Sequence, residues 1–63
     1  MLNMKIIRMK KGLKQKELAR RLGVRQATIA DIENERVKPR AVTVEMIAKE
    51  LGASVGVLMR RIA

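Results

Sequence analysis

The side chains in this sequence that could take part in chemistry are mainly cationic. The 63 residues include 15 Lys and Arg and six Asp and Glu, but no Cys, His or Tyr, which excludes zinc sites, disulfide bonds and imidazole catalysis. The carboxylates are scattered without the pairing that general acid–base catalysis needs, and the sole serine, Ser54, stands where it can cap a helix. The sequence therefore predicts a binding protein that is not an enzyme and uses no cofactor or metal.

The positive charge is concentrated in the first 25 residues. This segment holds nine Lys and Arg against a single acidic residue, a net charge of +8, whereas residues 26–63 have a net charge of +1. Such a block is typical of a surface that binds a polyanion, although a solvated face or a generally charge-rich composition would also produce it. Proteins that read RNA or single strands stack bases on aromatic or His side chains, and this chain has none. We therefore expect double-stranded DNA as the partner.

The elements that must position this charge begin with two helices predicted over 15–22 and 26–34. Apolar residues recur at helical spacing up to Leu22, Gly23 interrupts them, and isoleucines three residues apart restart the period. Glycine enters the left-handed conformation that ends a helix at little cost, and the small Ala19 allows a second helix to cross closely. The pattern predicts a helix, a tight turn and a second helix that crosses the first at a steep angle.

Three more helices complete the predicted domain. We expect one over 2–11, one that ends at Gly52, and a last one capped by Ser54, with residues 35–40 as a loop. Thr43 is a candidate N-cap of the fourth helix. Apolar side chains expected to face the core from the first and last helices include Leu2, Met9, Val55, Leu58 and Ile62. The fold class is therefore all-α, with five short helices in a single domain spanning residues 1–63.

Nothing in the sequence predicts a membrane or secretory segment. No apolar run approaches the roughly 20 residues that span a bilayer, and the first residues lack the apolar block of a signal peptide. The absence of Cys fits a reducing compartment. We expect a soluble, cytoplasmic protein.

Four pieces of the sequence carry a family resemblance: KGLKQKELARRLGV, ATIADIEN, ERVKP and MIAKELGASVGVLM. From about Met4 to Met59 the chain resembles the phage repressor and Cro type of helix-turn-helix domain, also called the XRE family. The resemblance implies a lambda-repressor-like fold and a transcriptional regulator that binds duplex DNA as a homodimer, whose pairing can depend on DNA. The alternative is a protein-interaction module, such as an antitoxin or a coactivator-bridging domain, because such proteins carry similar helices.

In this family the second helix of the motif lies in the major groove and its first residues contact bases. The matching positions here are Gln26, Ala27, Thr28 and Asp31. A glutamine amide can pair with adenine, and an alanine methyl suits the thymine methyl. The Asp31 carboxylate could accept from a cytosine amine or bind another protein side chain. An ordinary polar helix surface is the plainer interpretation of all four.

Other positions match phosphate contacts of the family. Gln15 stands at the start of the predicted second helix, whereas Asn34, Arg36, Lys38 and Arg40 belong to a loop that follows the DNA backbone. The family often has Thr or Ser at three helix starts where this chain has Lys14, Arg25 and Arg40. Basic side chains cannot accept from helix amides, so we expect capping to have been exchanged for phosphate attraction, unless water or other side chains cap these helices.

Two further positions concern the frame of the domain. Arg8 and Glu33 match a pair that the family often forms between its first and third helices, and in a buried pair the loss of one partner costs more than the intact pair contributes. The family usually has glycine where this chain has Glu35. The third helix is therefore expected to end either with a strained residue or in a different way.

Overall fold

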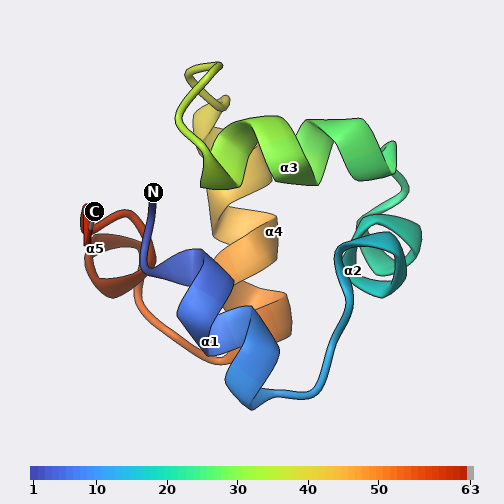
Figure 1. Cartoon of the computed structure of the whole chain (residues 1–63), viewed down its shortest axis with the longest axis horizontal. Coiled ribbons are helices and arrows are strands. Elements are labelled where there is room, and N and C mark those ends of the chain that lie inside the picture. The colour runs from blue at the N-terminus through green and yellow to red at the C-terminus, as the bar shows by residue number, and fades with distance from the viewer. Residues whose placement is uncertain (63) are drawn as a thin grey trace.

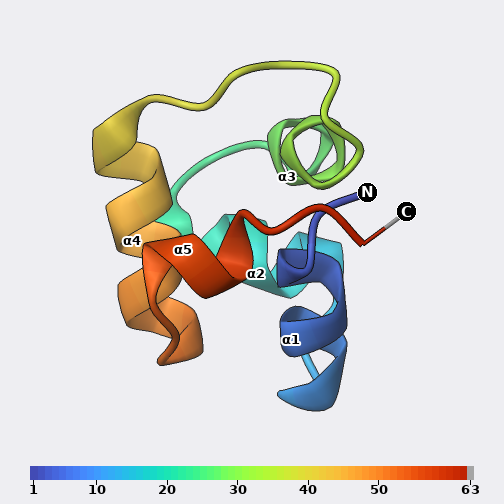
Figure 2. The same ribbon diagram turned by 90° about the vertical axis from the view of Figure 1, so that its left-hand side faces the viewer.

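The computed structural model describes residues 1–62, and all of its regular structure is helical apart from one isolated bridge between Leu2 and Arg61. Figure 1 shows the five helices and Figure 2 the same chain from the side. The predicted all-α fold with five helices is confirmed. The helices are α1 (Met4–Lys10), α2 (Gln15–Leu22), α3 (Gln26–Glu33), α4 (Ala41–Leu51) and α5 (Val55–Leu58).

The helix-turn-helix is formed by α2 and α3. The chain leaves α2 through Gly23, whose φ of 69° is left-handed, and the amide of Val24 donates to the carbonyl of Ala19 at 3.0 Å. In Figure 1 α2 is seen almost end-on while α3 lies across the view, and in Figure 2 the two exchange roles. Their axes therefore cross steeply, as expected from a small, buried Ala19.

The core is built from one face of every helix. Because it contains no aromatic ring, it consists of aliphatic side chains and one methionine. The residues with less than 2% of their surface exposed come from α1 to α5, and the apolar ones are Met4, Leu18, Ile29, Ile32, Ile47, Leu51 and Leu58.

The first helix is shorter than predicted. It begins at Met4, while Leu2 is buried outside it, in the bridged N-terminal segment. Met9 is 57% exposed and does not face the core. The buried residues of α1 are Met4 and Arg8. At about 100° per residue, Met9 lies roughly 140° around the helix from Met4 and therefore points away from the core.

Three expectations for the other helices are wrong. The third helix ends at Glu33, one residue early, and α4 begins at Ala41 with Arg40 at its N-cap, so Thr43 lies inside the helix. The last helix ends at Leu58. Val55 and Ile62 are each 41% exposed, and only Leu58 of the predicted apolar face is buried.

The physical reason for the early end of α5 is pairing between the two ends of the chain. The amide of Asn3 donates to the carbonyl of Arg60 at 2.8 Å, and the amide of Ile62 donates to the carbonyl of Met1 at 2.9 Å. These bonds hold residues 60–62 extended beside the N-terminal segment, so they cannot continue the helix.

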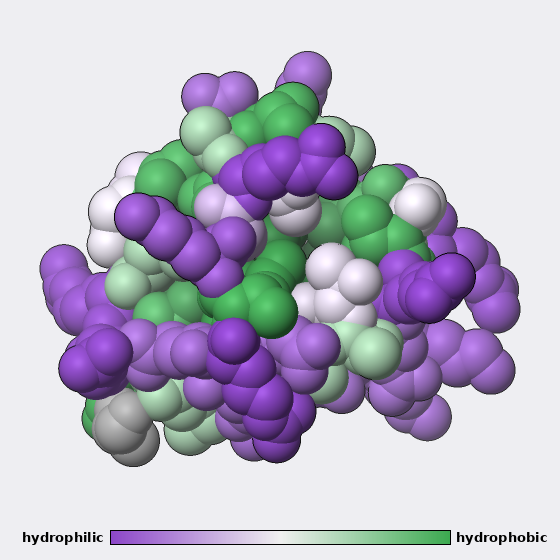
Figure 3. All heavy atoms as spheres, turned by 90° about the horizontal axis from the view of Figure 1, so that it is seen from above, coloured by the Kyte–Doolittle hydropathy of each residue, from purple (hydrophilic) through white to green (hydrophobic). Residues whose placement is uncertain are grey.

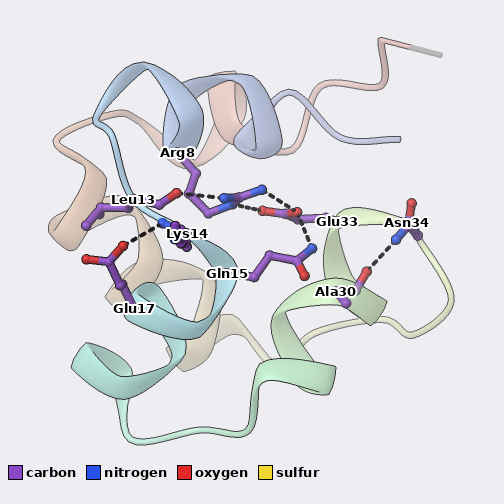
Figure 4. Close-up of polar contacts among 8 residues, drawn as sticks. All are labelled: Arg8, Leu13, Lys14, Gln15, Glu17, Ala30, Glu33 and Asn34. Carbon is purple, nitrogen blue, oxygen red and sulfur yellow. Dashed lines mark hydrogen bonds and ion pairs between the residues drawn. The ribbon is translucent and has the colours of Figure 1, made fainter.

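A buried ion pair joins α1 to α3 (Figure 4). Arg8 Nε donates to Glu33 Oε2 at 2.7 Å, and Nη2 donates to Oε1 at 3.3 Å. Arg8 Nη1 also donates to the carbonyl of Leu13 at 2.6 Å, and Gln15 Nε2 donates to Glu33 Oε1 at 2.9 Å. The side chains of Arg8 and Glu33 are 7% and 0% exposed, respectively. Because both charges are bonded on several sides, the desolvation cost of burying them is offset.

Breaking this pair on one side should unfold most of the protein. Arg8→Met or Glu33→Leu leaves one buried charge unpaired, at a cost of about 3–5 kcal/mol, which is comparable with the whole stability of a domain this small. The double variant Arg8→Met, Glu33→Leu removes both charges, so its unfolding temperature should be closer to that of the wild type than those of the single variants. Circular dichroism during thermal unfolding measures both.

The control is the exposed pair between Arg21 and Glu50, at 3.1 Å. Glu50→Leu should cost less than about 1 kcal/mol, because exposed pairs contribute little. If the double variant at positions 8 and 33 were no more stable than the singles, the pair would not act as a unit.

Candidate nucleic-acid interface

The first turn of α3 presents two of the predicted base-contacting residues to solvent. Gln26 and Ala27 are exposed, and Thr28 is half-buried. On the opposite face, Ile29 and Ile32 fix the helix to the core. The start of α3 is thus held rigidly while its outer side chains are free to contact a ligand.

A hollow of about 470 Å³ lies beside α3, between this helix, the loop 34–40 and the start of α4. Four residues predicted to contact DNA line it: Arg25, Thr28, Lys38 and Arg40. The remaining lining residues are Val24, Ile32, Val37, Pro39 and Thr43. Figure 3 looks onto this side of the molecule and shows hydrophilic side chains standing around patches of apolar surface. Residues from the turn, the loop and two helices are therefore brought together at one place.

Three helices, α2, α3 and α4, have a basic residue at the N-cap, and two of these residues, Arg25 and Arg40, line the hollow. Lys14, Arg25 and Arg40 all have the extended N-cap conformation, and none of their side chains makes a capping hydrogen bond. Ser54, in contrast, accepts from the amide of Val57 at 3.3 Å. Glu17 Oε1 accepts from the amide of Lys14 at 3.2 Å, which satisfies one amide at the start of α2 (Figure 4). The loss of capping expected from the sequence is thus present in the structure.

Asp31, whose role the sequence left open, has a protein partner. Its Oδ1 accepts from Arg36 Nη1 at 3.2 Å, with 37% and 65% of the two side chains exposed. An exposed pair of this kind contributes little to stability, and either side chain can be released to another partner. The structure therefore links a predicted base contact to a predicted phosphate contact.

Two predicted phosphate contacts are engaged within the protein. Gln15 donates from Nε2 to buried Glu33, as described above, and Asn34 Nδ2 donates to the carbonyl of Ala30 at 2.9 Å (Figure 4). Neither bond was expected from the sequence. The bond from Gln15 depends on tertiary approach, whereas the bond from Asn34 spans only four residues at the end of α3. The Gln15 side chain thereby connects the start of α2 to the buried pair.

The cations around the hollow, and Lys14 at the start of α2, are not neutralised within the described part of the chain. Four acidic residues form ion pairs, each with a partner outside this set of cations. Asp31 pairs with Arg36, Glu33 with Arg8, Glu50 with Arg21, and Glu35 with both Arg61 and the Met1 amine. Lys14, Arg25, Lys38 and Arg40 are exposed and take part in none of these pairs. Their positive field therefore extends into solvent, where it attracts an anionic ligand.

The sequence did not predict the apolar residues that line the hollow, or Thr43. These apolar residues are Val24, Ile32, Val37 and Pro39. Thr43 lies in α4 and lines the hollow next to Arg40. Its place follows once α4 begins at Ala41, whereas the sequence offered Thr43 as a candidate N-cap beside Arg40 at the helix start.

Among residues 1–62 no group of three or more His, Cys, Asp or Glu is arranged to hold a metal ion. No helix in the same range is long and apolar enough to cross a membrane.

Comparison with known proteins identifies the family of the chain. A family model described as helix-turn-helix, of the XRE type, matches residues 4–58, from the start of α1 to the end of α5. No curated protein matches the chain. The match includes the helix-turn-helix and every residue that lines the hollow, from Val24 to Thr43.

Restoring hydroxyl caps should stabilise the protein. In the triple variant Lys14→Thr, Arg25→Ser, Arg40→Ser, each hydroxyl can accept from a first-turn amide and should add roughly 0.5–2 kcal/mol to the free energy of unfolding. Calorimetry measures the change. The matched control is Ser54→Ala, which removes an existing cap and should lower stability by a similar amount per site. A triple variant less stable than the wild type would show that these helix ends are already satisfied.

Proposed function

The chain belongs to the XRE family of helix-turn-helix proteins, whose domains are DNA-binding transcription regulators, and on this premise we propose that it is a sequence-specific repressor of the phage repressor and Cro type. In this proposal α3 lies in the major groove of duplex DNA. The major groove, about 12 Å wide, admits a helix of this kind.

The observation that carries the proposal is the set of four predicted contact residues around the hollow beside α3. Arg25, Lys38 and Arg40 are unpaired cations there, next to the exposed first turn that holds Gln26 and Ala27. Cations grip phosphates and hold the protein in register, while the side chains between them can reach base edges. An ordinary polar helix surface does not require this convergence of cations from the turn before α3 and from the loop 34–40.

Each proposed contact has a chemical role. Gln26 pairs with adenine and Ala27 contacts a thymine methyl, while Thr28 serves as a hydroxyl donor or acceptor. Asp31 accepts from a cytosine amine after it releases Arg36, or stays with Arg36 and reads no base. The proposed phosphate contacts are Lys14, Gln15, Arg25, Asn34, Arg36, Lys38 and Arg40.

We further propose a homodimer on a palindromic site, with half-sites about 10 base pairs apart. Val55 and Val57 remain exposed on α5, at 41% and 37%. Val55 also lines an apolar cavity of about 300 Å³, together with residues that include Val44 and Met59. A second copy could cover this surface. The same surface favours the second candidate function, a protein-interaction module.

Binding selection from random duplex DNA distinguishes the two candidates. A repressor enriches a palindrome with the half-site spacing given above, whereas an interaction module enriches no sequence. The measurement requires only the purified chain and a duplex library.

The affinity for duplex DNA should fall steeply with salt. Five of the proposed phosphate contacts are cationic, and each contributes nearly one unit, so we expect a log–log slope of about −4 or steeper. In the triple cap variant the slope should become shallower by roughly 2–3 units, because three of these charges are removed. A flat salt response of the wild-type chain would contradict DNA binding.

Gln26→Ala and Lys38→Ala should fail in different ways. The loss of a base contact should relax preference at one base pair, by roughly 1–3 kcal/mol, whereas the loss of a phosphate contact should weaken all sequences about equally. Competition binding with single-base variants of the site measures both profiles. Lys49→Ala, at the other end of α4 from the hollow, is the matched control for lost charge and should have little effect. Identical profiles for the first two variants would place α3 outside the groove.

A further inference from the structure

The end of α3 is closed by a residue in an unfavourable conformation. Glu35 has a φ of 59°, and it is the only residue other than glycine with a positive φ among those described. Its amide donates to the carbonyl of Ile32 at 3.1 Å, and the amide of Arg36 donates to the carbonyl of Asp31 at 2.9 Å. This is the Schellman arrangement, in which glycine is preferred at the left-handed position.

The other three helix ends of this kind have glycine. Gly12, Gly23 and Gly52 close α1, α2 and α4, with φ values of 72°, 69° and 64°. Glutamate at the fourth such position carries a conformational cost that glycine would avoid, and such strain persists only where the surroundings hold it. An additional interaction of the Glu35 side chain must therefore offset the cost.

The Glu35 carboxylate is held by the C-terminal segment. Arg61 Nε donates to Oε1 at 2.9 Å and to Oε2 at 3.1 Å, and Arg61 Nη2 lies 2.8 Å from Oε1. The Met1 amine lies 3.0 Å from Oε2. The hydrogen bonds from Arg61 and then from the amine lower the pKa of the Glu35 carboxyl below its ordinary value, so the carboxylate is charged at neutral pH.

Arg61 is itself fixed by backbone bonds that do not involve Glu35. It forms the bridge with Leu2, and its neighbours Arg60 and Ile62 are bonded to the N-terminal segment. The amide of Leu2 also donates to the carbonyl of Glu33, at the end of α3, at 2.9 Å. The guanidinium of Arg61 is therefore held next to Glu35, near the start of the loop 34–40, by a fixed backbone.

We propose that Glu35 and Arg61 are positioning residues for DNA binding, because their ion pair fixes the turn from which the loop carrying Arg36 and Lys38 departs. This inference rests on the proposed function and deepens it. Neither residue needs to touch DNA. A turn held in one conformation presents the loop cations before DNA arrives, so less freedom is lost on binding than with a glycine turn.

Glu35→Gly separates positioning from stability. The melting temperature should stay about the same, because relief of left-handed strain offsets the lost ion pair and the greater freedom of glycine in the unfolded chain. Affinity for duplex DNA should nevertheless fall by about three- to tenfold, since the loop must be ordered on binding. Removal of a negative charge would by itself strengthen DNA binding, so the direction of the change identifies the cause.

Arg61→Gln tests the other partner, with Arg60→Gln as its matched control. Arg60 is an exposed neighbour that takes part in no side-chain ion pair within residues 1–62, so both variants lose one positive charge from the same segment. Arg61→Gln should weaken binding by about three- to tenfold with an unchanged salt slope, because no phosphate contact is lost. Arg60→Gln should have little effect, and Arg61→Lys should recover part of the affinity.

Amide hydrogen exchange of the free protein tests the turn without DNA. The Arg36 amide, which donates to the carbonyl of Asp31, should exchange faster in Arg61→Gln than in Arg60→Gln. If the wild-type chain bound no duplex DNA, the proposed function would fail and the DNA role of this pair with it, whatever the exchange rates. If the wild type bound DNA, undiminished affinity of Glu35→Gly or equal affinities of the two glutamine variants would overturn the positioning role alone.

Discussion

The buried pair of Arg8 and Glu33 is the interaction on which the other contacts depend. It joins α1 to the end of α3. Arg8 also bonds the carbonyl of Leu13 in the turn before α2, and Glu33 accepts from the side-chain amide of Gln15 at the start of α2. The core has no aromatic side chain, and the apolar contacts that hold these elements together are non-directional. The ion pair adds direction, because a guanidinium and a carboxylate bind well only in a planar arrangement.

The charges that remain after internal pairing determine what the surface can do. The ion pairs of the described residues engage Arg8, Arg21, Arg36 and Arg61, and leave the cations at the starts of α2, α3 and α4 without an acidic partner. A hydroxyl cap at those positions would stabilise each helix, so the basic residues have a cost in the free protein. That cost is understandable if a phosphate replaces the missing cap in the complex, since both the amides and the side chain then act on the same anion.

The sequence predicted the parts of the fold that local pattern controls. Helical periodicity and the stops at Gly23 and Gly52 predicted the observed bounds of α2 and the end of α4, because both signals act within one or two turns. It failed at the chain ends, where Leu2 and Arg61 pair across the whole length of the chain. The site was predicted as a set of positions, but the bond from Gln15 to Glu33 and the hollow beside α3 depend on tertiary approach, which no local pattern contains.

The short length of α3 explains why these distant contacts matter for binding. A helix of eight residues is too short to be stable alone in water, so its orientation is set by what holds its two ends. The turn at Gly23 holds the first end against α2. At the other end, Glu33 is bonded to α1 and α2, and Glu35 to the segment that follows α5. Thus α1, α2 and the segment after α5 contribute polar or covalent constraints at the two ends of α3, while α4 contributes through the core. We expect displacement of Arg8, Gln15 or Arg61 to change the orientation of the outer face of α3, although none of these residues lines the hollow.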